Sequence, residues 1–196
     1  MRFMIKGLIY SAQMPWVRLL TSPMAKTSIC AICAQNGPTC CQLGQGQAGF
    51  LFPLSSVEKE AITACDRWKN VCFTSRTSNS TRFISRLLNI FPNDRDKIQT
   101  LYPEHGDHEH LSIDKQGSCI FLGPMGCHLP EKARPLYCRL FPFWVIDGRV
   151  DFFTFDLCLA QKGARSVNKV MKRLKMKTSQ ILPLYEALRK AWVSNK

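Results

Sequence analysis

Four cysteines lie within twelve residues near the N-terminus, and their spacing constrains the fold more than any other feature of the chain. They are Cys30, Cys33, Cys40 and Cys41, in the pattern C-x2-C-x6-C-C. Two thiolates separated by two residues can bind one metal ion, because a tight turn brings both sulfurs to the same side. Gly37 and Pro38 then favour a reversal of the chain, which brings Cys40 and Cys41 toward the same centre. We therefore expect this segment to bind metal.

The remaining cysteines and the N-terminal composition indicate a reducing compartment. Ten cysteines in 196 residues is about five per cent, too few for a small fold built on disulfides. The apolar patch at residues 7–10 is interrupted by Ser11, Gln13 and Arg18, so it lacks the continuous core of a signal peptide. No apolar run approaches the ~20 residues of a membrane span. We expect a cytoplasmic protein with no membrane partner, in which clustered thiols bind metal.

Charge and composition divide the chain into three parts. Residues 1–28 are expected to be a disordered or non-native extension, because the sequence MAKTS beginning at Met24 resembles a natural start. Residues 29–160 form the cysteine-bearing domain, in which acidic and basic residues balance. Residues 161–196 carry ten Lys and Arg against Glu186 alone, so most of the net charge of +13 lies there. Their apolar spacing predicts basic amphipathic helices docked on the domain.

The hydrophobic pattern predicts a small α+β domain that is mostly helical, with two short β-hairpins, organised around a cysteine-ligated metal site and followed by C-terminal helices. Ser55 and Glu58 form a capping-box pattern ahead of a helix over residues 56–71. The Asp147-Gly148 pair predicts a tight hairpin turn, and residues 123–126 predict another that places Cys119 and Cys127 on facing strands. Further helices are expected over 83–91, 94–101 and 167–174, with a last one capped by Thr178 or Ser179.

Two other groups of histidine or cysteine side chains could either bind metal or have a structural role. His108 and His110 would share one side of a strand, so the segment 104–110 is either a metal site or an edge strand that begins near His108. Cys65 and Cys72 are seven residues apart on the predicted helix 56–71 or at its end, and they are either buried small side chains or additional ligands.

A second group of thiols follows the helices. With the first group it makes a set of eight, which suits two four-coordinate sites, or one site with several thiols that do not bind metal. The members of this second group are Cys119, Cys127, Cys138 and Cys158. Cysteine ligands without clear histidines favour Zn²⁺ or an iron–sulfur cluster. Such centres are anionic, and Arg139 or Arg134 is placed to offset the charge from the second coordination shell. For Arg139 the alternative is an ordinary surface ion pair.

These motifs resemble a known family. The C-x2-C and Cys-Cys pairs, with the string RPLYCRLFP from Arg134 to Pro142, are similar to the zinc- or iron-chelating cysteine-cluster family, described by a CxxCxxxCC motif, which includes the flagellin lysine N-methylase branch. The resemblance covers about residues 29–160. It implies a metal-ligand role for Cys30, Cys33, Cys40, Cys41, Cys119, Cys127, Cys138 and Cys158. The chain has six residues between Cys33 and Cys40 where the family motif has three, so the loop before Cys40 is longer.

The sequence therefore predicts a metal-binding protein that holds zinc or an iron–sulfur cluster. No catalytic residue is assigned, because the chain lacks Gly-x-Ser-x-Gly, His-Glu-x-x-His and GxGxxG motifs. The resemblance implies one alternative, an iron–sulfur-dependent protein-lysine N-methyltransferase. The basic C-terminal helices supply another, a nucleic-acid-binding accessory protein. The expected partner is the metal ion or cluster, with a protein partner as a further alternative.

Overall fold

The structure is a computed structural model that describes residues 28–37, 39–42 and 51–194. Within these residues it contains seven α-helices and three two-stranded antiparallel sheets, so the predicted α+β class is confirmed. The expected N-terminal extension, including the possible start at Met24, lies almost wholly outside the described residues. None of the described helices is both long enough and apolar enough to cross a membrane.

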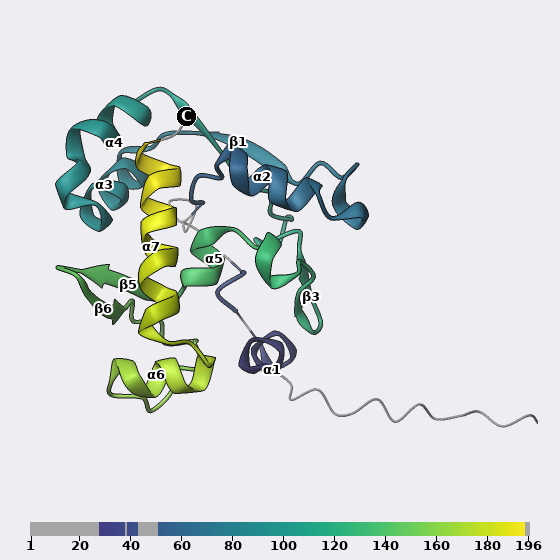
Figure 1. The fold of residues 1–196 in the computed structure, drawn as a ribbon. Coiled ribbons are helices and arrows are strands. Elements are labelled where there is room, and N and C mark those ends of the chain that lie inside the picture. The colour runs from purple at the N-terminus through teal and green to yellow at the C-terminus, as the bar shows by residue number, and fades with distance from the viewer. Residues whose placement is uncertain (1–27, 38, 43–50, 195–196) are drawn as a thin grey trace, which may run out of the picture.

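The helices and strands alternate along the chain rather than forming separate blocks (Figure 1). The helices are α1 (Ile29–Asn36), α2 (Ser56–Thr63), α3 (Thr81–Ile90), α4 (Arg95–Leu101), α5 (Leu136–Leu140), α6 (Val167–Leu174) and α7 (Thr178–Val193). The strands are β1 (Thr74–Ser78), β2 (Asp107–Leu111), β3 (Leu122–Gly123), β4 (Gly126–Cys127), β5 (Phe143–Ile146) and β6 (Arg149–Phe152).

The first cysteine pair lies on a helix instead of the expected turn. The Ser28 hydroxyl accepts a hydrogen bond from the amide of Ala31 at 3.1 Å, which caps the N-terminus of α1. The helix ends at Gly37, whose φ of 136° is one that glycine adopts more readily than other residues. Cys30 and Cys33 are therefore three residues apart on one helix, and this spacing also brings their side chains to one face.

Helix α2 has the predicted capping box but is shorter than predicted. The Ser55 hydroxyl accepts from the Glu58 amide, and the Glu58 carboxylate accepts from the Ser55 amide at 2.8 Å. The helix ends at Thr63 rather than near residue 71, and a single 3-10 turn, Asp66–Trp68, follows. Cys65 and Cys72 consequently do not share a helix face.

A third sheet, β1–β2, was not predicted. Strand β1 has the sequence TSRTS, which lacks the alternation of apolar residues by which a half-buried strand is recognised. It pairs with β2 from Thr74 opposite Leu111 to Ser78 opposite Asp107. Cross-strand polar contacts support the pairing, including Arg76 with Glu109 at 3.2 Å. The alternative interpretation of 104–110 as an edge strand is confirmed, since β2 begins at Asp107.

The two predicted hairpins are present. Asp147 and Gly148 have φ values of 48° and 72°, as a type I′ turn requires, and Ile146 pairs with Arg149 across it. The other hairpin is only two residues a side, with Leu122 opposite Cys127. The predicted facing of Cys119 and Cys127 is wrong, because Cys119 instead forms an isolated bridge with Ile113.

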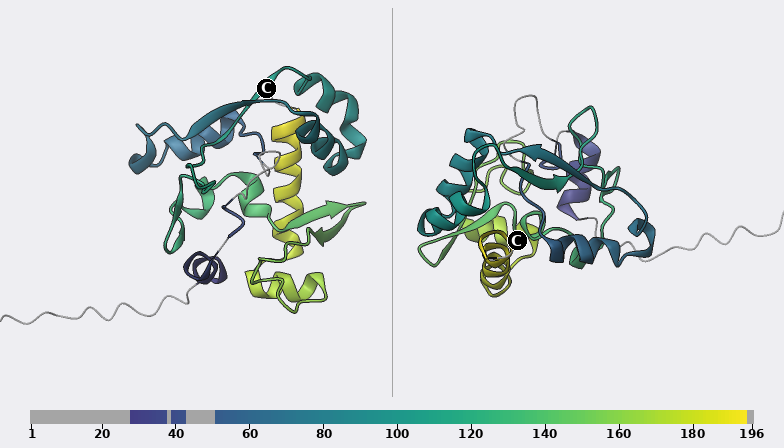
Figure 2. Two further views of the ribbon diagram at one scale, coloured as in Figure 1. Left: turned by 180° about the vertical axis from the view of Figure 1, so that it is seen from behind. Right: turned by 90° about the horizontal axis from the view of Figure 1, so that it is seen from above.

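The buried apolar residues form two separate clusters. The larger one includes Phe83, Phe91, Trp144, Leu188 and Trp192, so α3, β5 and the C-terminal helix α7 share one core. The smaller one consists of Leu54, Ile62, Phe73, Phe121 and Leu129. Figure 2 shows the elements from behind and from above: α7 lies beside α3, α4 and β5–β6, and α2 and β3 lie on the other side.

Candidate metal centre

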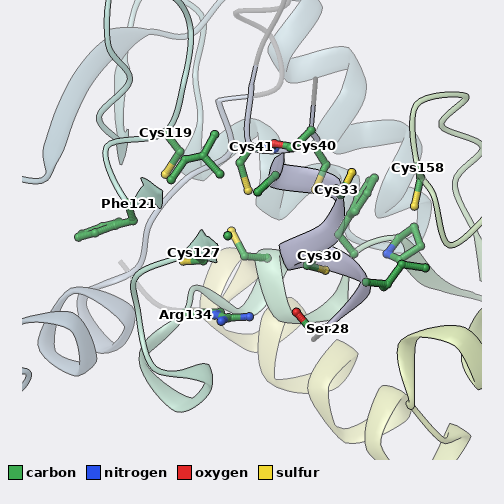
Figure 3. A pocket seen from close by; sticks show the side chains of 18 of the residues that line it. Ser28, Cys30, Cys33, Cys40, Cys41, Cys119, Phe121, Cys127, Arg134 and Cys158 are labelled. Carbon is green, nitrogen blue, oxygen red and sulfur yellow. The ribbon is translucent and has the colours of Figure 1, made fainter. Parts of the chain in front are cut away.

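All eight cysteines that the sequence nominates line one cavity of about 130 Å³. They come from both groups, Cys30, Cys33, Cys40 and Cys41 before the helices and Cys119, Cys127, Cys138 and Cys158 after them. Figure 3 shows α1 passing through this site, with Cys119 and Cys127 on one side of it and Cys158 on the other. Segments that lie about eighty residues apart in sequence thus contribute thiols to the same space.

Backbone pairing brings the two groups together. The Cys119 amide donates a hydrogen bond to the Cys41 carbonyl at 2.8 Å, and Gln42 forms an isolated bridge with Ser118. On the other side of the site, α1 packs directly on β4. A Cβ placed on Gly126 would lie 3.7 Å from the Ala31 backbone, and the φ of 93° at Gly126 also favours glycine. This close approach places Cys127 near Cys30 on α1.

Helix α5 places Cys138 at the back of the cavity. The amide of Leu136 donates to the buried Glu58 carboxylate at 2.7 Å, so α2 fixes the start of α5. Cys138 lines the cavity with part of its surface accessible, and the protein around it raises the pKa of its thiol. A thiol in this position can reach a group bound inside the protein.

The cavity also lies between the two apolar clusters. Cys158 packs against the larger cluster, and Cys119 and Cys127 pack against the smaller one. A group bound by these thiols would therefore connect two parts of the protein that have separate cores.

The thiols in this structure are not grouped as a closed coordination shell. All ten cysteines are free, and no three of the described His, Cys, Asp and Glu side chains are arranged to hold a metal ion as they stand. Burial is the main cause of the raised pKa values of four of these thiols. It raises the pKa of Cys119 to about 12, and it also raises the pKa values of Cys30, Cys127 and Cys138. Coordination would have to remove these protons, as metal binding to cysteine does.

Cys41 differs from these thiols because its pKa is lowered. A hydrogen bond from the Cys40 thiol lowers the pKa of Cys41 to about 7, and the Thr39 hydroxyl and the positive charge of Arg134 act in the same direction. The pKa of Cys40 rises correspondingly. One thiolate is thus available near neutral pH where the two groups of cysteines meet.

The two arginines proposed for the second shell have different positions. Arg134 lines the cavity, donates through Nε to the Leu129 carbonyl at 3.0 Å, and lowers the pKa values of Cys30, Cys41 and Cys127 through its charge. Arg139 is not among the described residues that line the cavity. The positive charge at the site is therefore that of Arg134.

Cys65 and Cys72 are not part of this cavity. The Cys65 thiol lies 3.6 Å from the Ala61 carbonyl, and the Cys72 thiol lies 3.8 Å from the Thr74 carbonyl. Neither residue lines the cavity that the other eight share. These two thiols provide internal controls for experiments on the site.

A second cavity of about 120 Å³ adjoins the first, and sequence reasoning did not detect it. Cys40, Cys41, Cys119 and Cys138 line both cavities, so they form the wall between them. The other described lining residues are apolar or aromatic, apart from His110. Phe52, Tyr137 and Trp192 are stacked or tilted against one another with ring centroids 4.3 to 5.9 Å apart. A cavity assembled from segments so distant in sequence leaves no local pattern by which to predict it.

Comparisons of the chain with protein-family models, with curated proteins and with solved structures give no match.

Proposed function

We propose that this protein binds a thiolate-ligated metal centre, zinc or an iron–sulfur cluster, in the cavity between α1, β4 and α5. The observation that carries the proposal is that all eight nominated cysteines line that one cavity, while Cys65 and Cys72 do not. The resemblance to the zinc- or iron-chelating cysteine-cluster family points to the same chemistry.

The donor set favours a metal that prefers sulfur. Eight thiols line the cavity, and none of its described lining residues is a carboxylate. Magnesium and calcium require oxygen ligands, whereas cysteine sulfur selects zinc, copper(I) or iron–sulfur clusters. The single guanidinium of Arg134 offsets part of the negative charge that deprotonated thiols would bring. The residues present therefore fit a zinc or iron–sulfur centre.

The number of thiols favours more than one metal ion. A tetrahedral zinc site uses four ligands, with Zn–S bonds of ~2.3 Å. Eight thiols line this cavity, twice that number, so they suit a polynuclear cluster or two neighbouring ions.

Metal content after anaerobic purification tests the proposal. We expect at least one equivalent of zinc or iron per chain, with a brown colour and broad visible absorption if the centre is iron–sulfur. The variant Cys127→Ser should lose metal, and Cys65→Ser should retain it, because Cys127 lines the cavity and Cys65 does not. Folded wild-type protein that contains less than about half an equivalent of zinc plus iron would contradict the proposal.

A further inference from the structure

We propose that His110 supplies a nitrogen ligand to this metal centre, through Nε2, from the side of the second cavity. The inference rests on the proposed function, since it names a further ligand of the same centre. It makes the centre one of mixed sulfur and nitrogen coordination rather than of cysteine alone.

The first support is the position of His110. It lies on β2, is 4 % exposed, and lines the second cavity together with the four thiols of the shared wall, Cys40, Cys41, Cys119 and Cys138. The next residue, Leu111, lines both cavities.

Backbone contacts place the segment that follows His110 next to the segment that contains Cys119. After β2, Ile113 forms a bridge with Cys119, and the Ile120 amide donates to the Ser112 carbonyl at 3.0 Å. These contacts align residues 112–113 with 119–120. The imidazole is therefore held on the same local framework as the Cys119 thiol.

The second support is the hydrogen bonding of the ring. His110 Nδ1 lies 2.7 Å from the Leu111 carbonyl oxygen. Since a carbonyl can only accept, Nδ1 must carry the proton, and the neutral ring then has its lone pair on Nε2. No described residue is hydrogen-bonded to Nε2. A histidine that donates one ring N–H to a backbone carbonyl and presents the other nitrogen is the arrangement seen at protein metal sites.

The neighbouring His108 lacks these properties, although it lies on the same face of β2. Its Nδ1 and Nε2 each lie 2.8 Å from an oxygen, of Asn79 and of Leu51 respectively, and its ring stacks on Phe83 at a centroid distance of 3.9 Å. Both nitrogens are thus already engaged. His108 is a structural residue and the natural control for His110.

Cadmium NMR of the wild-type protein tests the ligation directly. We would load protein whose histidines are ¹⁵N-labelled with ¹¹³Cd, which substitutes for zinc at thiolate sites, and record the coupling between the two nuclei. We expect coupling from one histidine Nε2, absent from His110→Gln and retained in His108→Gln. In competition with a chromophoric chelator, His110→Gln should bind metal at least about tenfold more weakly than the wild type. His110→Cys should recover most of the affinity.

The outcomes separate the two proposals. Cadmium bound stoichiometrically to the wild type with no coupling to any histidine nitrogen would overturn the role of His110 and leave the thiolate centre intact. Coupling that persists in His110→Gln would assign the ligand to another histidine and also overturn it. A wild-type chain that binds neither cadmium nor iron would overturn both proposals. Coupling in the wild type shows that a histidine is a ligand, and its loss in His110→Gln but not in His108→Gln assigns that ligand to His110.

Discussion

The buried carboxylate of Glu58 connects helix α2 to the segment that carries Cys138, and its removal is expected to destabilise both. Glu58 accepts hydrogen bonds from the Ser55 hydroxyl at 2.6 Å, the Ser55 amide at 2.8 Å and the Leu136 amide at 2.7 Å. The first two bonds belong to the capping box of α2. The third fixes the first turn of α5, two residues before Cys138.

The magnitude of a Glu58→Ala change follows from these bonds. Loss of a helix cap costs roughly 0.5–2 kcal/mol of unfolding free energy. An amide left without a partner in the interior costs a further 1–3 kcal/mol or so. We therefore expect Glu58→Ala to lower the free energy of unfolding by about 2–4 kcal/mol, a large share of the roughly 5–15 kcal/mol typical of a domain. Glu58→Gln should cost less, because the amide oxygen can still accept from one donor.

Urea unfolding at a fixed metal concentration measures this change, with Glu60→Ala as the matched control. Glu60 lies on the same helix with an exposed side chain, so its removal should change stability by less than about 0.5 kcal/mol. Glu58→Ala should also bind metal more weakly, since Cys138 is positioned by the same segment. Equal stability of Glu58→Ala and Glu60→Ala would refute the reasoning.

Three further predictions concern other parts of the fold. Asp94→Asn should lower the free energy of unfolding by about 1–2 kcal/mol, because Arg189 donates to both carboxylate oxygens of Asp94, at 2.7 and 2.9 Å. The loss is no larger because the Arg189 side chain is 41 % exposed and solvent screens its charge. These hydrogen bonds hold the pKa of Asp94 below its ordinary 3.8, so the stability that Asp94 contributes is complete above pH 3.8 and is lost as the pH falls through the lower folded-state pKa. Urea unfolding of the wild type and of Asp94→Asn should therefore give converging stabilities at that low pH. Phe121→Ala should cost about 3–5 kcal/mol in the same assay, because the ring is fully buried in the smaller cluster and packs edge-on against Trp68. Removing metal with a chelator should accelerate amide hydrogen exchange in the smaller cluster more than in α3 and α7, and uniform acceleration would contradict this.

The elements that the sequence predicts well are those whose signals are local. The Asp147-Gly148 turn requires two positive φ values, which few other residue pairs adopt, so the pair alone predicts the hairpin. Helix α3 has a Ser80 cap, a strong apolar stripe and a stop at Pro92, and each of these acts within a few residues. The cysteine spacing and the family resemblance together nominate the eight thiols, and all eight line one cavity.

The features that sequence reasoning missed depend on contacts between distant residues. Strand β1 is polar along its length and forms because β2 is available to pair with it, about thirty residues later. The role of Glu58 at the start of α5 spans 78 residues. In the sequence His108 and His110 look alike, and they differ in the structure because Asn79 and Leu51 are hydrogen-bonded to the His108 ring and not to the His110 ring.

The position of the cavity explains why a metal would matter to a chain of this kind. The smaller apolar cluster has five buried residues, too few to stabilise the elements around it independently. Thiols of Cys119 and Cys127 pack on that cluster, while Cys158 packs on the larger one. Ligation of all three would therefore restrain the small cluster relative to the large one in the folded state. Structural zinc sites supply on the order of 10–16 kcal/mol in small peptides. This is comparable with the roughly 7.5–15 kcal/mol that five buried side chains contribute at about 1.5–3 kcal/mol each. By this reasoning a bound metal would take the place of a continuous core.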